Sequence, residues 1–153
     1  MMKFLMVCLG NICRSPIAEG IMNAKLVAAN IQGKVDSAGV LSYHSGEAPD
    51  KRAISVAGKY QIDISGQVAR QFRRSDFTDF DVILVMDKSV QTEISSLANT
   101  DQERNKVKLL LEYAGIHEIT EVPDPYYGGQ EGFEMVYNML DEGCKRILFN
   151  LSK

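Results

Sequence analysis

The chain has 153 residues, a length that suits one compact domain with a sizeable hydrophobic core. Its formal net charge is −3 at pH 7, which argues against broad binding to nucleic acid or to an anionic membrane surface. No apolar stretch approaches the roughly 20 residues of a transmembrane helix, so we expect no membrane insertion.

The three cysteines, Cys8, Cys13 and Cys144, are too few for a disulfide framework in a chain of this size. They form no CxxC or Cys/His cluster, so the sequence predicts no metal site and no cofactor. A reducing, cytoplasmic setting is the plain interpretation. The Lys before the apolar run at 4–9 is compatible with a signal peptide, but the run is short and no small-residue cleavage site follows it. We therefore interpret the run as a core strand.

Taken in chain order, the sequence alternates between apolar runs and helical patterns. Residues 3–9 are almost wholly apolar and are followed by Gly and Asn, which predicts a buried strand. Ser15 and Pro16 are then typical of the N-cap and first residue of a helix, and apolar spacing extends that helix to about residue 30. Further elements are expected as follows: a weak strand at 34–40, a loop at 41–52, a helix at 50–61, a strand at 81–86, a short helix at 88–98, a strand at 106–115, a turn-rich segment at 123–132 and a final amphipathic helix at about 131–151.

The alternation of strands and helices predicts a single α/β domain over residues 1–153. Parallel pairing of the strands would give a doubly wound sheet with helices on both faces. In such folds ligands bind beyond the carboxyl ends of the strands, where the strand order reverses. The loop that follows the first strand is therefore the first place to look for a site.

The segment VCLGNICRSP, residues 7–16, has the chemistry of an oxyanion site. A loop before a helix N-terminus presents unpaired backbone N–H groups and the positive end of the helix dipole. Gly10 lets the backbone fold closely around an anion, and Arg14 supplies a planar fork suited to phosphate oxygens. The same field favours a thiolate at Cys8, and the C-x5-R spacing closes the loop around one tetrahedral anion. No Lys follows the glycine, so the loop is not of the Walker type.

The same residues also have an interpretation without a functional site. A Cys and an Arg six residues apart occur by chance in many proteins, and a buried Cys at a strand end is usually a core residue. The strand before the loop, the Ser-Pro after it and the Gly-Asn within it favour the functional interpretation.

At residues 8–19, CLGNICRSPIAE resembles the signature of the low-molecular-weight protein tyrosine phosphatases. DPYYGG at 124–129 is similar to the general-acid loop of that family, and two such motifs near the two ends of one chain are specific together. The resemblance covers essentially the whole chain and implies a four-stranded parallel, flavodoxin-like sheet with helices on both faces. Three intermediate stretches agree with it, namely DSAGV at 36–40, ARQF at 69–72 and VILVMD at 82–87.

The resemblance implies hydrolysis of phosphotyrosine in proteins, and of small aryl phosphates, without a cofactor. Cys8 matches the nucleophile that forms a phosphocysteine intermediate. Arg14 and the backbone N–H groups of residues 9–14 would hold the phosphate oxygens. Asp124 matches the general acid that protonates the leaving group and later activates water. By itself Asp124 would be a turn residue, because Asp-Pro commonly opens turns.

Family positions also assign loop support and substrate contacts. The implied partners are phosphotyrosine proteins or peptides, and inorganic phosphate or similar oxyanions. Residues that hydrogen-bond and shape the loop would be Asn11, Ser15 and Ser37, with Gln67 as further support. A slot for an aromatic ring would be lined by Ile12, Tyr43, Tyr126 and Tyr127, and the implied substrate-binding set is completed by Leu9, Gly10, Asn11, Cys13 and Ser15.

Cys13 admits two interpretations. By resemblance it would trap an oxidised Cys8 as a disulfide and so protect the nucleophile from irreversible oxidation. The alternative is that Cys13 is a small apolar residue of the loop. Cys144 lies on the apolar face of the predicted final helix and is expected in the core.

The sequence departs from the family pattern at several positions. Gln67 stands where the family often has a His that bonds the phosphate loop, which bears on the loop's hydrogen-bond network. Tyr43 occupies an aromatic position that is often Trp. His44 and His117 have no evident partner in the sequence, and we interpret both as ordinary surface or loop residues. The basic run RQFRR at 70–74 is interpreted as a solvated face.

Three rival functions stay open on the sequence. A protein-arginine phosphatase of the same fold commonly carries Thr at the position of Ile12, whereas Ile12 favours an apolar ring. A thioredoxin-linked arsenate reductase needs two further cysteines near residues 80–90, and residues 77–96 contain none. A non-catalytic phosphate-binding or redox-sensing module would bind without releasing phosphate, and the intact catalytic set argues against it.

Overall fold

The structure is a computed structural model that describes residues 1–152. Four parallel strands form one sheet in the order β2-β1-β3-β4. The strand order reverses at β1, which pairs with β2 on one side and with β3 on the other. The predicted four-stranded parallel sheet is therefore confirmed. The strands are β1 (Met2–Cys8), β2 (Gly33–Gly39), β3 (Val82–Val85) and β4 (Val107–Leu109).

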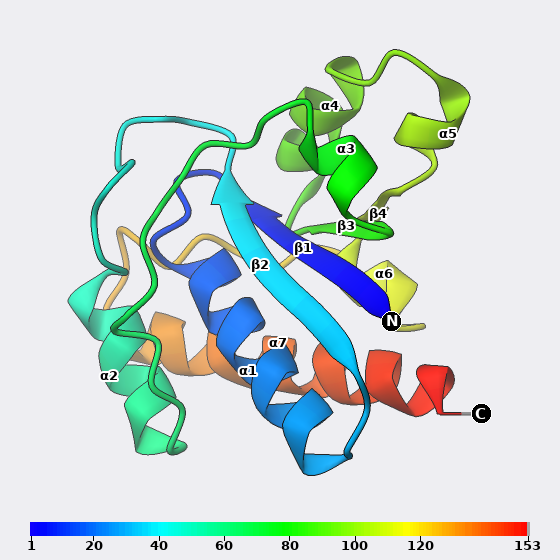
Figure 1. Cartoon of the computed structure of the whole chain (residues 1–153). Helices are drawn as coiled ribbons and strands as arrows, with labels where there is room; N and C mark the ends of the chain where they lie inside the picture. The colour runs from blue at the N-terminus through cyan, green and yellow to red at the C-terminus, as the bar shows by residue number, and fades with distance from the viewer. Residues whose placement is uncertain (153) are drawn as a thin grey trace.

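Helices cover both faces of this sheet (Figure 1). Helices α1, α2 and α7 pack against one another on one face, and α3 and α4 lie on the opposite face. The doubly wound α/β architecture agrees with the prediction. In the part of the chain that the structure describes, no helix is long and apolar enough to cross a membrane. The helices are α1 (Arg14–Ala28), α2 (Lys51–Lys59), α3 (Asp76–Asp79), α4 (Lys88–Ser96), α5 (Asp101–Arg104), α6 (Leu110–Tyr113) and α7 (Gln130–Leu151).

The core is divided in two by the alternation of side chains along β1. Phe4 and Met6 point into a cluster built with α1 and α7. Leu5 and Val7 point the other way, into a cluster built with α3 and α4. Because β1 is buried on both faces, its sequence is almost continuously apolar, as is usual for a central parallel strand.

The prediction of one strand over 106–115 is wrong. The strand β4 ends at Leu109, and α6 follows at once. Both leucines at the start of α6 are buried, and the side chain of Leu110 packs so closely on α7 that a Cβ at Gly143 would lie 2.7 Å from it. Burial on two sides makes the segment uniformly apolar, and such a run does not distinguish a strand from a short helix.

The prediction that Ser15 caps α1 is also wrong. Helix α1 begins at Arg14, two residues before the expected first residue Pro16, and no side chain caps its N-terminus. The Ser15 hydroxyl bonds to other groups of the loop, and Pro16 is accommodated within the first turn, where a missing N–H leaves no gap in the hydrogen-bond ladder.

Three segments meet at the carboxyl edge of the sheet, beside the point where the strand order reverses. Residues 9–13 connect β1 to α1, and residues 40–50 connect β2 to α2. The third segment, residues 123–129, leads into α7 and comes from the other end of the chain (Figure 1). Residues of all three segments line one cavity, which is where this class of fold places its ligands.

Candidate active site

The loop between β1 and α1 bends sharply around the sulfur of Cys8. Asn11 has a left-handed backbone conformation, with φ of 59°, which asparagine adopts more readily than most residues. The bend brings the backbone N–H of Asn11 to 3.3 Å from Cys8 Sγ, to which it donates. Gly39 lets the loop lie close to β2, because a Cβ there would come within 2.9 Å of the carbonyl carbon of Gly10. The sequence thus folds this loop tightly around one thiol.

Hydrogen bonds of the Asn11 side chain hold the loop in place. The Asn11 amide group donates to the hydroxyls of Ser15 at 2.7 Å and of Ser37 at 3.0 Å. Its Oδ1 accepts from the backbone N–H of Arg70 at 3.0 Å. The Ser15 hydroxyl oxygen lies 2.9 Å from Cys8 Sγ, where its proton can stabilise a thiolate. The conformation of the loop and the environment of the sulfur therefore depend on the same network.

Arg14 lies beside the sulfur with its side chain 3% exposed. Its Nη1 donates to Asp87 Oδ2 at 2.6 Å and to the Val122 carbonyl at 2.9 Å. Its Nη2 lies 3.8 Å from Asp124 Oδ2. Burial by itself would lower the pKa of Arg14, but the negative charges of Cys8, Asp87 and Asp124 raise that pKa above its ordinary value. The guanidinium is therefore a fixed positive charge at the wall of the site.

Asp124 reaches the same space from the segment before α7. Its side chain is 38% exposed, and Oδ1 accepts from the backbone N–H of Tyr126 at 3.0 Å. This local turn orients the carboxyl group, while Oδ2 faces Arg14. A carboxyl group that is oriented by the backbone and open to the cavity can donate and accept protons.

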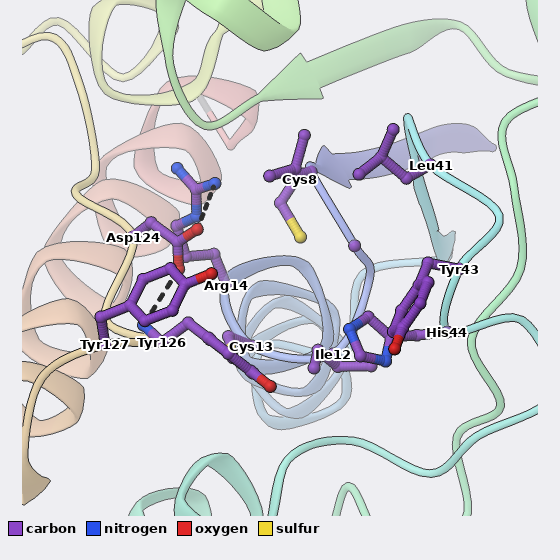
Figure 2. A pocket seen from close by; sticks show the side chains of 12 residues that line it. Cys8, Ile12, Cys13, Arg14, Leu41, Tyr43, His44, Asp124, Tyr126 and Tyr127 are labelled. Carbon is purple, nitrogen blue, oxygen red and sulfur yellow. Dashed lines mark hydrogen bonds and ion pairs between the residues drawn. The ribbon is translucent and has the colours of Figure 1, made fainter.

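A cavity of about 330 Å³ opens above the Cys8 sulfur (Figure 2). Tyr126 and Tyr127 lie on one side of the sulfur, and Tyr43 and His44 lie on the other (Figure 2). The volume of this cavity is in the range of small-ligand sites. The cavity is lined by Cys8, Leu9, Gly10, Ile12, Cys13, Arg14, Leu41, Tyr43, His44, Asp124, Tyr126 and Tyr127.

Three of the residues assigned to the substrate or to the loop lie elsewhere. Asn11 and Ser15, expected among the substrate contacts, do not line the cavity, because their side chains are used in the network behind the loop. Gln67, expected to support the loop, donates from Nε2 to the Pro16 carbonyl at 3.0 Å and so contacts the first turn of α1 instead. Ser37 does meet the loop through Asn11.

His44 lies in the loop after β2, as expected, but it is not an ordinary loop residue without a partner. Its Nδ1 lies 3.1 Å from Glu47 Oε2, and its ring meets the Tyr43 ring edge-on at 4.8 Å between centroids. A Cβ at Gly10 would lie 3.1 Å from His44 Cδ2, so the imidazole packs directly on the loop. Leu41 is a second lining residue that the sequence did not indicate. The only signal for these two residues in the sequence is that both lie within two residues of Tyr43.

The basic run 70–74 is not uniformly solvated. The Arg70 guanidinium donates to both carboxylate oxygens of Asp76 at 3.0 Å each, and Asp76 is completely buried. Arg70 also donates to Asp36 Oδ2 at 3.1 Å. The backbone N–H of Arg70 donates to Asn11 Oδ1. The basic run therefore helps to hold Asn11, which supports the loop between β1 and α1.

All three cysteines are free thiols. Burial, with the nearby charge of Asp50, raises the pKa of Cys13, so this residue stays protonated. Cys144 is completely buried in the core, as predicted, and burial raises its pKa to about 12. Within residues 1–152, no three His, Cys, Asp or Glu side chains are grouped so that they could hold a metal ion.

Comparison with known proteins identifies the family. The sequence model described as "Low molecular weight phosphotyrosine protein phosphatase" matches residues 3–153. The chain belongs to this family. It is an enzyme of the protein-tyrosine-phosphatase class, which is a family of hydrolases.

Relatives and solved structures of this family are similar to the chain along nearly its whole length. A Synechocystis protein with a provisional low molecular weight protein-tyrosine-phosphatase name is 46% identical over 154 residues, covering 99% of this chain and 98% of that protein. The crystal structure of a protein tyrosine phosphatase from Entamoeba histolytica, with Hepes in its active site, has a TM-score of 0.93 and 36% identity, covering 99% of this chain and 97% of that one. A Drosophila arginine phosphatase also has a TM-score of 0.93, at 35% identity and 99% coverage of both chains. The fold is therefore shared by a phosphatase named for tyrosine and one named for arginine.

Proposed function

We propose that this phosphatase hydrolyses phosphotyrosine in proteins and peptides, and small aryl phosphates, through a phosphocysteine intermediate. The observation that carries the proposal is the convergence of three groups on one cavity. Cys8 Sγ lies at its base, the Arg14 guanidinium beside the sulfur, and the Asp124 carboxyl group at the wall. These are the groups that a nucleophile, an oxyanion clamp and a general acid require.

In the first step the Cys8 thiolate attacks phosphorus in line with the tyrosine oxygen. An S–P bond forms as the P–O bond to the phenol breaks, and Asp124 gives its proton to the departing oxygen. Backbone N–H groups of residues 9–14 and the Arg14 fork would hold the three other phosphate oxygens as charge moves onto them. The products of this step are the dephosphorylated tyrosine residue of the substrate and phosphocysteine.

In the second step water attacks the phosphorus of phosphocysteine. The Asp124 carboxylate takes a proton from this water as the new O–P bond forms, and the S–P bond breaks to release inorganic phosphate and the Cys8 thiolate. The Ser15 hydroxyl, 2.9 Å from the sulfur, would ease this departure by hydrogen bonding to the thiolate.

An aromatic substrate is favoured by the apolar part of the cavity. Ile12 is 7% exposed and presents a hydrocarbon surface, and Tyr43, Tyr126 and Tyr127 add ring faces. A tyrosine ring would pack against these groups, whereas the guanidinium of phosphoarginine would lose water against Ile12 without gaining an acceptor there. Phosphoarginine is the second candidate substrate, because a Drosophila arginine phosphatase has the same fold.

The proposal includes a reducing, cytoplasmic setting. Cys8, the last residue of β1, and Cys13, the residue before α1, are both free thiols. A disulfide between them would remove the nucleophile reversibly and protect it from further oxidation. Assays of this enzyme therefore need a reductant, and recovery of activity after brief peroxide treatment would measure the protection.

Trapping the covalent intermediate tests the proposed chemistry. The substrate is a peptide whose phosphotyrosine carries a labelled phosphoryl group. After rapid quenching and proteolysis, we expect the label on the fragment that contains Cys8. Cys8→Ser is expected to abolish turnover and labelling while an oxyanion still binds to the loop. Label on another residue, or appreciable turnover by Cys8→Ser, would remove Cys8 as the nucleophile.

A further inference from the structure

Arg52 on α2 lies outside the cavity lining and contacts the segment that carries Asp124. Its Nη2 donates to the Tyr126 carbonyl at 2.9 Å, and its Nη1 donates to the Gly128 carbonyl at 2.8 Å. One guanidinium therefore holds two peptide groups of the acid loop, which we define as residues 124–129. A planar fork with several donors makes this arrangement possible, and a lysine ammonium group cannot reproduce it.

The Arg52 fork is itself fixed by a neighbouring carboxylate. Asp50 Oδ1 accepts from Arg52 Nε and Asp50 Oδ2 accepts from Arg52 Nη2, each at 3.0 Å. The guanidinium carbon also lies 4.6 Å from the centre of the Phe133 ring and 5.6 Å from that of the Tyr126 ring. Ion pairing and aromatic contacts restrict the rotamers of a side chain that is otherwise flexible.

Asp50 also connects the fork to the loop that surrounds the nucleophile. Its backbone N–H donates to the Ile12 carbonyl at 2.8 Å. Its side chain accepts from the backbone N–H of Arg52 at 2.8 Å and so caps α2. Hydrogen bonds thus run from the Cys8 loop, through Asp50 and Arg52, to the acid loop.

The decisive contact is at the Tyr126 residue. Its carbonyl accepts from Arg52, and its N–H donates to Asp124 Oδ1 at 3.0 Å. We infer that Arg52 is a positioning residue for the general acid, which it orients through the backbone of Tyr126. This inference rests on the proposed function, because it gives Arg52 a role only if Asp124 protonates the leaving group.

Leaving groups distinguish this role from general support of the fold. Phenol is a poor leaving group and needs a proton as its P–O bond breaks, whereas dinitrophenol leaves readily as the anion. Misplacing Asp124 should therefore slow phenyl phosphate and spare dinitrophenyl phosphate. A shift of about 1 Å in a catalytic group can lower the rate by roughly 100-fold, so we expect Arg52→Met to lower kcat/KM for phenyl phosphate by roughly 10- to 100-fold.

The experiment measures kcat/KM for both substrates and the inhibition constant of inorganic phosphate. It compares the wild type with Arg52→Met, Arg52→Lys, Asp124→Asn and the double variant Arg52→Met/Asp124→Asn. Arg146→Met is the matched control, because Arg146 is an exposed arginine that pairs with Glu142 on α7, away from the cavity. Circular dichroism checks that each variant is folded.

We expect Arg52→Met to slow phenyl phosphate selectively, with phosphate inhibition unchanged and Arg52→Lys intermediate. In the Asp124→Asn background the same change should have an effect of less than about twofold, because residues that act through one group are not additive. Equal losses for the two substrates, a full additional loss in the double variant, or no loss at all would overturn the inference. If Asp124→Asn itself slowed both substrates equally, the acid assignment of the proposed function would fail, and the role of Arg52 with it.

Discussion

Replacing Glu19 with Gln should make the free energy of unfolding less dependent on pH. Glu19 lies on α1, and its Oε1 accepts from the Ser37 hydroxyl at 2.6 Å. Burial raises the pKa of this carboxyl group from 4.5 to about 7; the Ser37 hydrogen bond opposes the change, the charge of Asp36 adds to it, and Arg70 opposes it. The carboxyl group therefore holds its proton in the folded protein at pH values where the unfolded chain has lost it.

The sign of the effect follows from that difference in bound protons. Stability contributed by protonated Glu19 is fully present below pH 4.5 and is lost as pH rises through about 7. One unit of pKa difference corresponds to about 1.4 kcal/mol. Allowing for partial exposure of the side chain, Glu19 should lower the free energy of unfolding by about 2 kcal/mol between about pH 5 and about pH 8.

The assay is urea unfolding of wild type and Glu19→Gln at both pH values. We expect the wild type to lose about 2 kcal/mol more than the variant over this range, because glutamine does not titrate. Glu142→Gln, which changes an exposed carboxylate on α7, controls for the loss of a negative charge. Equal pH dependence in wild type and Glu19→Gln would show that Glu19 ionises normally in the folded protein and would refute this reasoning.

Three further predictions concern the site. Asp87→Asn should lower kcat/KM by roughly 10- to 100-fold, since Arg14 loses a charge-assisted hydrogen bond, while helix α4 keeps its N-cap because asparagine caps as well as aspartate does. Gly39→Ala should weaken inhibition by inorganic phosphate and destabilise the protein by about 1–3 kcal/mol in urea, because the added Cβ would displace the loop backbone. The wild-type kcat/KM should follow a bell-shaped pH profile with an acidic optimum, since Cys8 must be ionised and Asp124 protonated; Asp124→Asn should lose the alkaline limb, and a flat wild-type profile would contradict the assignment.

The sheet and the loop were predictable because their physical signals are local. Residues buried on both faces make β1 and β3 continuously apolar, and parallel strands bring their carboxyl ends to one edge. A thiol, a glycine and an arginine at the end of the first strand then indicate an anion site without knowledge of tertiary contacts. Asp124 needed the family resemblance, since an Asp-Pro pair alone indicates only a turn.

Other features depend on contacts between residues far apart in the sequence. Helix α6 was hidden because burial against α7 makes its sequence as apolar as that of a strand. Ser15 has the composition of a cap, but its hydroxyl is needed by Asn11 and Cys8. The packing of His44 on the loop at Gly10 also joins residues far apart in the sequence, so only the nearby Tyr43 pointed to it. Arg52 gave no signal, because the carbonyl groups to which it donates lie more than 70 residues away.

Phosphate release from matched phosphotyrosine and phosphoarginine peptides, with EDTA and reductant present, tests the central claim most directly. Chemistry that uses Cys8, Arg14 and Asp124 without a metal predicts faster release from phosphotyrosine, at a rate that EDTA does not change and that Cys8→Ser abolishes. Preference for phosphoarginine would keep the loop chemistry and contradict the substrate assignment made from Ile12. Release from neither peptide would contradict the proposed hydrolysis itself.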